Sequence, residues 1–423
     1  MEASFTYAAA LDEADELRRF RDEFYFPARE GANQSGGGPA VYFCGNSLGL
    51  QPKGATAGAE RILEAWKEYA VAGYFKGGAP WMQYGARFKK GLSEIVGCKE
   101  SEVTVMNTLT VNLHLLLCSF YKPTPQRYKI LVEAGAFPSD QYAVETQVRF
   151  HGLEPDQAIV EVSPREGEKW IREEDLETAI NQAGPALALV LIGGVSYYTG
   201  QFFDIERITR ATHAVGATAG FDLAHAAGNV PMRLHDWNVD FAVWCGYKYL
   251  NGGPGAAGCA YIHERFSSDP HFHRFGGWGG SDTKTRFLMP KAFTPEPGAD
   301  GWNLSVAQGL VMAGMEASLE LFEAAGMERL RRKSETLTGY LEYLLDQLPG
   351  RPFELITPRD PAARGAQLSL FFPKNGAAVQ AALSEAGIVT DYREPGVIRV
   401  SPAPLYNSFT DVYRLYEVLA KVD

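Results

Sequence analysis

The central part of the chain alternates between strand-like and helix-like segments, and this order constrains the fold more than any other feature. Short runs rich in β-branched and apolar residues recur between residues 102 and 262: EVTVMN, YKILVE, ALALVLIGG, ATAGFDLA, DFAVWCG and AAGCAYI. Apolar residues recur at helical spacing in the segments 12–25 and 54–71. A repeated order of strand, loop and helix predicts an α/β fold with a mostly parallel central sheet flanked by helices. Ligands of such sheets bind at the carboxyl ends of the strands.

The pattern changes near residue 306. Two long helical segments, 307–326 and 328–348, are followed by the strand-like run QLSLFF, the helical run AAVQAALSEAG and the strand-like run VIRVSP. A chain of 423 residues is long enough for two or three domains. We therefore predict a large α/β domain at 46–305, and a smaller α+β domain made of 306–423 together with 1–45.

Charge and cysteine content exclude several classes of protein. The formal net charge of −11 argues against a nucleic-acid-binding surface. No apolar run approaches the length of a membrane span, and the first residues are acidic where a signal peptide is basic. The five cysteines are widely spaced and contain no C-x-x-C pair. We predict a cytoplasmic protein with buried free thiols and no metal site, which binds neither nucleic acid nor a membrane.

Three features meet at the predicted strand ends. Lys248 lies in GYKYLNGGPG, directly after the buried run FAVWC. Asp222 ends the preceding strand-like run, and His225 follows it in GFDLAHAAGN, so Asp222 and Lys248 could enter one crevice. The turn 107–111 joins a strand to an apolar helix that is predicted to begin near Val111; its free amides and threonine hydroxyls could bind a phosphate. Each feature alone is also compatible with an ordinary helix cap or loop.

Together these features fit one cofactor, pyridoxal 5'-phosphate. This cofactor requires an amine that holds its aldehyde as a Schiff base, a carboxylate that keeps its pyridine nitrogen protonated, and an amide-rich site for its phosphate. Lys248, Asp222 and the turn 107–111 supply one of each.

Longer motifs extend this interpretation over nearly the whole chain. They are YFCGNSLGLQPK, MNTLTVNLH, AFPSDQYA, YYTGQ, GFDLAHAAGN, GYKYLNGG and IRVSPAPLYNSF. With these motifs the chain resembles the kynureninases, which are fold-type I pyridoxal-phosphate enzymes. The resemblance implies that the chain hydrolyses the Cβ–Cγ bond of L-kynurenine or 3-hydroxykynurenine to anthranilate or 3-hydroxyanthranilate and L-alanine, in tryptophan catabolism or secondary metabolism. It also implies a homodimer with the active site at the interface.

The same resemblance implies roles for individual residues. Lys248 would hold the cofactor and act as the base at Cα, and Tyr247 would relay protons. The implied cofactor-binding residues are Leu109, Thr110, Phe137, Pro138, Ser139, Asp140, Asp222, His225, Tyr247, Lys248 and Trp278. The implied substrate-binding residues are Asn46, Ser47, Tyr74, Val306 and Arg399, of which Arg399 would bind the substrate α-carboxylate as a guanidinium fork.

Several positions depart from the family pattern, and most of them belong to the implied aryl pocket. Tyr74 stands where a histidine is usual, and Val306 stands where a polar residue is expected. After Trp278 the family pattern has a bulky residue and a glycine-histidine pair, but this chain reads GGS, a run that ends at Ser281. Gly193 replaces a hydroxyl residue of some relatives. A homologue that acts on a differently substituted aryl-keto amino acid is therefore an alternative. An aminotransferase or a cysteine desulfurase of the same fold, and a non-catalytic relative, are others. Desulfurases usually carry a histidine where this chain has Tyr247.

Overall fold

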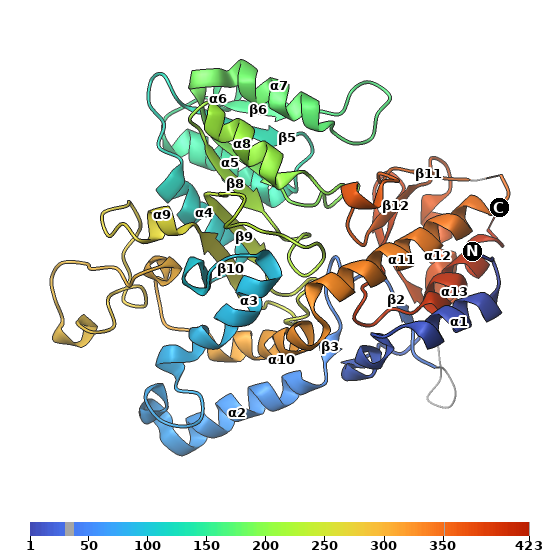
Figure 1. Cartoon of the computed structure of the whole chain (residues 1–423), viewed down its shortest axis with the longest axis horizontal. Helices are drawn as coiled ribbons and strands as arrows, with labels where there is room; N and C mark the ends of the chain where they lie inside the picture. The colour runs from blue at the N-terminus through green and yellow to red at the C-terminus, as the bar shows by residue number, and fades with distance from the viewer. Residues whose placement is uncertain (30–37, 351, 423) are drawn as a thin grey trace.

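A central sheet of seven strands, in the order β4-β10-β9-β8-β7-β5-β6, forms the middle of the larger unit (Figure 1). The computed structural model describes residues 1–29, 38–350 and 352–422, and this sheet is counted within them. Its strands are β4 (Val103–Val105), β5 (Lys129–Glu133), β6 (Ile159–Val162), β7 (Leu187–Gly193), β8 (Thr218–Asp222), β9 (Phe241–Cys245) and β10 (Gly258–Ile262). Neighbouring strands from β6 to β9 are parallel, whereas β10 is antiparallel to both β9 and β4. The predicted mostly parallel sheet is confirmed.

Helices cover both faces of this sheet. Alternate residues of β7 enter different core clusters: Leu189 and Leu191 pack with α4 and α5, whereas Val190 and Ile192 pack with α7 and α8. This follows from the two-residue period of a strand, which turns successive side chains to opposite faces. The helices of the chain are α1 (Phe5–Ala14), α2 (Gly54–Tyr69), α3 (Lys89–Val96), α4 (Leu109–Phe120), α5 (Pro138–Phe150), α6 (Pro155–Ala158), α7 (Glu173–Ala183), α8 (Ile205–Ala214), α9 (Glu264–Ser267), α10 (Gly309–Ala325), α11 (Met327–Asp346), α12 (Gly376–Glu385) and α13 (Phe409–Leu419).

A second, smaller unit lies at the right of Figure 1 and holds both ends of the chain. Its sheet has the order β11-β12-β15-β14. Its strands are β11 (Glu354–Leu355), β12 (Leu368–Phe371), β14 (Asp391–Arg393) and β15 (Val397–Val400), and a short parallel pair joins β2 (Val41–Tyr42) to β13 (Ile388–Val389). Ala8 and Phe43 pack into one cluster with α11 and α13, so the N-terminal segment contributes to this core.

The division into domains at residues 45/46 and 305/306 stays a prediction. The buried residues of α10 pack in the core of the larger unit, and those of α11 lie mostly in the core of the smaller one. Residues 30–37, which belong to the predicted small domain, lie outside the described part of the chain.

The prediction of one helix over 12–25 is wrong in its extent. The chain instead forms α1, a 3₁₀ helix at Arg18–Glu23 and the strand β1 (Phe24–Tyr25), which pairs with β3 (Gln51–Pro52). The Asp15 side chain accepts a hydrogen bond from the Leu17 amide at 2.9 Å. Such local bonds from aspartate compete with the helical pattern and end α1. The helices predicted at 54–71, 307–326 and 328–348 are present as α2, α10 and α11.

Two further expectations concern free thiols and membrane spans. All five cysteines are unpaired; Cys44, Cys245 and Cys259 are buried, and Cys98 and Cys118 are partly exposed. Within the described residues, no helix combines the length and the apolar character that crossing a membrane requires.

Candidate functional site

A cavity surrounds Lys248 at the carboxyl ends of β8 and β9. Nine of the predicted cofactor-binding residues line it: Leu109, Thr110, Phe137, Ser139, Asp140, Asp222, His225, Tyr247 and Lys248. Pro138 lies beside them in the first turn of α5. These side chains come from segments far apart in the sequence, and they meet because parallel strands end at the same edge of a sheet.

Lys248 is held over this cavity by the loop that follows β9. Its Nζ lies 3.0 Å from Nε2 of His225, and 5.7 Å from the ring centre of Phe137. Burial, and then the positive charge of Lys248, hold the pKa of His225 well below its usual range, so its imidazole is neutral and accepts this bond. The Gly49 amide donates to the Tyr247 carbonyl at 2.8 Å, and a Cβ on Gly49 would lie 2.4 Å from the Lys248 carbonyl oxygen. The GNSLGL segment therefore fixes the lysine loop only because Gly49 has no side chain.

Two aspartates face each other beside the lysine. Asp222 ends β8, and its Oδ1 accepts the Ala224 amide at 2.7 Å. Asp140, from α5, hydrogen-bonds to Asp222, and its pKa is raised well above the usual range by burial and then by the Asp222 charge. Burial also raises the pKa of Asp222, whereas the hydrogen bond from Asp140 and the charge of Lys248 lower it. The pair therefore favours a proton on Asp140 over one on Asp222.

The N-termini of α4 and α5 meet at the other end of the cavity. The hydroxyls of Thr110 and Ser139, one from each first turn, lie 2.7 Å apart. Neither helix is capped by the side chain before it, Thr108 or Phe137. Two uncapped helix N-termini present free amides and positive dipole ends, which suit an anion such as a phosphate. The helix predicted near Val111 begins two residues earlier, so Thr110 lies inside its first turn.

The geometry of these residues fits pyridoxal 5'-phosphate. Asp140 Oδ1 and His225 Nδ1 are buried polar atoms that have no hydrogen-bond partner among the described residues. Buried polar atoms are ordinarily paired, so both point to a bound group. An amine, a carboxylate pair and an anion site thus surround one cavity in the arrangement that this cofactor requires.

Arg399 and Ser47 lie one layer behind the cavity. Arg399 is buried on β15; its Nη2 lies 2.8 Å from Asp391 Oδ1 and 3.2 Å from Ser47 Oγ. Tyr197, which lines the cavity, contacts Arg399: its carbonyl accepts from Arg399 Nη1 at 2.7 Å, and its ring centre lies 6.5 Å from that of His225. Asn46, also fully buried, donates from Nδ2 to Gln367 at 2.8 Å.

The remaining predicted residues do not line this cavity. Trp278 is 41% exposed and lies edge-on to the Phe287 ring at 5.5 Å, and the Ser281 hydroxyl donates to its carbonyl. Tyr74 packs edge-on against Trp81 at 5.3 Å, and Val306 is partly buried before α10. These positions lie on segments that project from the body of the larger unit (Figure 1).

Sequence reasoning missed several residues of the cavity. Glu133, Val195, Tyr197 and Ala224 line it; Tyr197 lies in the motif YYTGQ and Ala224 in the motif GFDLAHAAGN, but neither was assigned a role. Glu133 carried one usable signal, because a carboxylate directly follows the apolar residues 130–132 at the end of the strand run YKILVE. Gly193, which departs from the family pattern, also lines the cavity, and its amide donates to both carboxylate oxygens of Glu133 at 3.1 Å.

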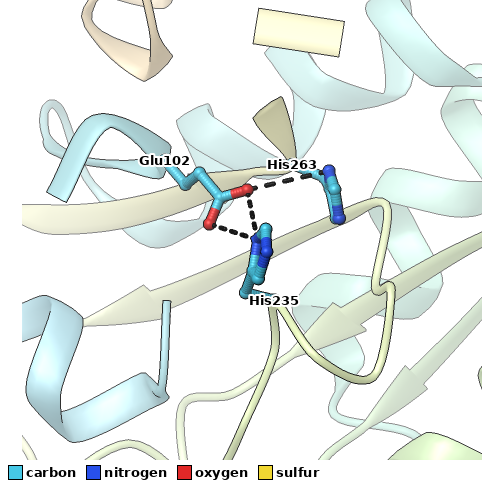
Figure 2. Close-up of side chains that lie close together, drawn as sticks. All are labelled: Glu102, His235 and His263. Atoms are coloured by element: carbon cyan, nitrogen blue, oxygen red, sulfur yellow. Dashed lines mark hydrogen bonds and ion pairs between the residues drawn. The ribbon is translucent and has the colours of Figure 1, made fainter. Parts of the chain in front are cut away.

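A second group of titratable side chains lies at the opposite edge of the sheet (Figure 2): Glu102 precedes β4, and His263 follows β10. His235 Nδ1 lies 3.0 Å from both oxygens of Glu102, and these groups could in principle contact one metal ion. However, Glu102 also accepts the Glu264 amide, and His263 Nδ1 accepts the Arg265 amide. The two imidazoles stack at 5.0 Å with only 22° between their planes. Because imidazole lone pairs lie in the ring plane, nearly parallel rings do not converge on a cation, and the group joins three loops by hydrogen bonds.

Comparisons with known proteins agree with this geometry. The family model described as the kynureninase C-terminal domain matches residues 330–419. The chain is 52% identical over 418 residues to the kynureninase of Myxococcus xanthus (strain DK1622), covering 99% of this chain and 97% of that protein. It is 50% identical to the kynureninase of Flavobacterium psychrophilum (strain ATCC 49511 / DSM 21280 / CIP 103535 / JIP02/86), again over 418 residues, with 98% and 97% covered.

Solved structures show the same fold. A C-DES mutant with glycine covalently linked to its PLP cofactor is similar with a TM-score of 0.75 at 19% identity, covering 91% of this chain and 97% of that one. The cysteine desulfurase CsdA from Escherichia coli gives a TM-score of 0.73 at 17% identity, covering 95% and 97%. The predicted fold-type I architecture is confirmed.

Proposed function

Because the chain belongs to the kynureninase family, we propose that it hydrolyses the Cβ–Cγ bond of L-kynurenine, or of 3-hydroxykynurenine, to anthranilate or 3-hydroxyanthranilate and L-alanine. The observation that carries this proposal is the similarity to kynureninases over nearly the full length of the chain, with 52% and 50% identical residues. The cavity in which Lys248, Asp222 and two helix N-termini meet agrees with it. Pyridoxal 5'-phosphate is the cofactor that this cavity fits. When bound, it supplies a conjugated ring that accepts the electron pair released at the substrate Cα.

The residues around Lys248 have different proposed roles in cofactor binding and proton transfer. The Lys248 amine would hold the cofactor and then take the proton from the substrate Cα. Asp222, kept ionised by the proton on Asp140, would accept a hydrogen bond from the ring nitrogen. Thr110 and Ser139 would bind the phosphate, together with the amides of their helices.

Tyr247 is the proposed proton donor to the substrate Cβ. It adjoins Lys248 and lines the same cavity. Burial, followed by the neighbouring Cys245, raises the pKa of Tyr247, so its phenol keeps the proton that it would donate. Before this step, water would add to the γ-ketone carbon and the Cβ–Cγ bond would break, which releases the aryl carboxylate and leaves the electron pair on Cβ. Protonation of Cβ by Tyr247 then gives alanine as the second product.

Arg399 is the proposed partner of the substrate carboxylate. A guanidinium fork suits a carboxylate, but in this structure Asp391 already occupies part of it. The substrate carboxylate would therefore share the guanidinium with Asp391 or displace it.

Assembly as a homodimer with the active site at the interface is also part of the proposal. Large apolar side chains are exposed on the segments that carry Tyr74, Trp278 and the start of α10: Trp66, Val71, Phe75, Phe287, Leu288, Met289, Leu310 and Val311. Exposed apolar patches of this extent mark interaction surfaces. A partner chain on this surface would bring such segments towards a Lys248 cavity. The unpaired cysteines support a cytoplasmic location.

Product analysis tests the proposed function. The purified protein loaded with pyridoxal phosphate should convert L-kynurenine to equal amounts of anthranilate, read by fluorescence, and alanine. The rival activities have their own products: sulfane sulfur from cysteine for a desulfurase, and a keto acid for an aminotransferase. Either of these products without alanine and anthranilate would refute the proposal.

A further inference from the structure

Two cavities meet at the carboxylates beside Lys248. The first is the lysine cavity described above. The second, which we call the outer cavity, has a volume of about 550 Å³ and extends away from the lysine between α5, α6 and β6. Glu133, Asp140, Gly193 and Asp222 line both. Water in the outer cavity can therefore reach these carboxylates without passing the side on which Lys248 lies.

Glu133 lies at the junction of the two cavities. It is the last residue of β5, and the Gly193 amide points between its two carboxylate oxygens, at 3.1 Å from each. A Cβ on Gly193 would come within 3.0 Å of Glu133 Oε1. The absence of a side chain at this position thus lets the Glu133 carboxylate lie over the end of β7, next to Asp222 on the neighbouring strand.

The charges around Glu133 are mostly negative. On the lysine side it faces Asp140 and Asp222, with Lys248 as the cation of that cavity. On the outer side, the cavity is lined by the ion pair Glu145–Arg149, and by Asp156 and Glu161. Burial raises the pKa of Glu133 to about 7, the Gly193 amide opposes this, and the Asp222 charge adds to it. The Glu133 charge in turn raises the pKa of Asp140. An ionised Glu133 therefore favours the proton on Asp140.

We propose that Glu133 is a positioning residue that fixes how many negative charges the Asp140–Asp222 pair presents to the ring nitrogen of the cofactor. This inference rests on the cofactor placement proposed above. Glu133 acts on the ring nitrogen through Asp140, with which it lines both cavities. With Glu133 ionised, Asp140 keeps its proton and donates to Asp222, and the pair carries one charge. Without the Glu133 charge, Asp140 loses its proton at a lower pH.

Glu133→Gln separates charge from structure, because the amide oxygen still accepts from Gly193. The readout is the infrared carbonyl band of the protonated Asp140 carboxyl, assigned by its absence in Asp140→Asn and titrated in the protein without cofactor. We expect Glu133→Gln to lower the midpoint of this titration by about one pH unit, the scale on which a neighbouring like charge shifts a carboxyl. Glu161→Gln, which removes a charge from the outer cavity without contact to Gly193, should leave the midpoint where it is in the wild type.

Gly193→Ala provides a second test that keeps all three carboxyls. Its Cβ should push the Glu133 carboxylate away and lower the Asp140 midpoint in the same direction. An Asp140 midpoint that is unchanged in Glu133→Gln or, if that variant does not fold, in Gly193→Ala would overturn the inference and leave Glu133 a structural hydrogen-bond acceptor. In the loaded enzyme, the alkaline limb of kcat on kynurenine should move with this midpoint. A shifted midpoint in a protein that does not cleave kynurenine would retain the inferred coupling and refute the proposed function.

Discussion

At the scale of single residues, the site depends on which side chains carry charge. Burial favours a neutral His225 at hydrogen-bond distance from Lys248, and the Asp140–Asp222 pair favours its proton on Asp140. Each state has a named cause in burial or in a neighbouring charge. Substitutions that change a charge without changing size therefore test the account more sharply than truncations do.

Asp222→Asn should lower kcat on kynurenine by at least about a hundredfold, because a neutral amide cannot hold the proton on the cofactor ring nitrogen. Asp240→Asn is the matched control, since Asp240 is also buried but lies at the start of β9, where it pairs with His213 and Arg265. The control should lower the melting temperature and keep kcat. Steady-state kinetics that show equal losses in both variants would contradict a catalytic role for Asp222.

Val306→Asn should raise the rate on kynurenine, because an apolar valine cannot donate a hydrogen bond to the aryl end of the substrate. For the same reason the wild-type protein should cleave kynurenine with modest efficiency and show little preference for the 3-hydroxylated substrate. Kinetics on both substrates check this. A preference of about a hundredfold for one of them, or a Val306→Asn variant slower on both, would show a pocket built for another ring.

At the scale of elements, the start of α4 depends on a glycine of β10. A Cβ on Gly258 would lie 2.7 Å from the Thr108 carbonyl carbon and 2.9 Å from the Leu109 amide nitrogen. Gly258→Ala should therefore displace the phosphate-binding helix start and raise the Kd for pyridoxal phosphate about tenfold or more.

The control for this variant is Gly339→Ala on α11, where a Cβ would meet no atom within 4 Å. Alanine favours a helix over glycine by about 1 kcal/mol, so this control should keep cofactor affinity and gain slightly in stability. Titration with pyridoxal phosphate, followed by absorbance, measures the cofactor affinity of both variants. Equal affinity in the two variants would mean that the α4 terminus does not hold the phosphate.

Elements also show what the sequence could predict. The order of strands and helices around Lys248 was predictable, because apolar runs and helical spacing are local signals and parallel strands must end at one edge. The segment 12–25 was mispredicted, because its apolar spacing does not reveal the Asp15 bond that ends α1. The short strand β6 was missed because four residues, IVEV, carry little periodic signal. Glu133 was missed as a site residue because its partner, the Gly193 amide, is a backbone group that no side-chain pattern records.

At the scale of the whole molecule, the predicted site residues other than Asn46, Ser47 and Arg399 fall into two groups. Those around Lys248 meet within one chain, whereas Tyr74, Trp278 and Val306 lie outside that cavity, on or beside exposed apolar segments. A motif can assign a residue to a site, but it does not say which chain supplies it.

Leu288→Glu should therefore weaken self-association and lower activity together, because it places a charge on a side chain that is 77% exposed within the apolar surface. Phe150→Glu is the control: Phe150 is 78% exposed at the end of α5 and is not part of that surface. Sedimentation velocity at micromolar concentration should show a wild-type dimer, a dissociated Leu288→Glu variant and a dimeric control. A fully active wild-type monomer would contradict the dimer proposal.

The most direct test of the whole account is to locate the cofactor. The protein loaded with pyridoxal phosphate is reduced with borohydride, digested, and its peptides are mapped by mass spectrometry, with Lys248→Ala treated in parallel. The account predicts one modified lysine, Lys248, in the peptide that contains GYKYLNGG. The variant should bind cofactor without a covalent link and lose turnover by several orders of magnitude. A modified lysine elsewhere, or an unmodified Lys248 in an active enzyme, would contradict the account.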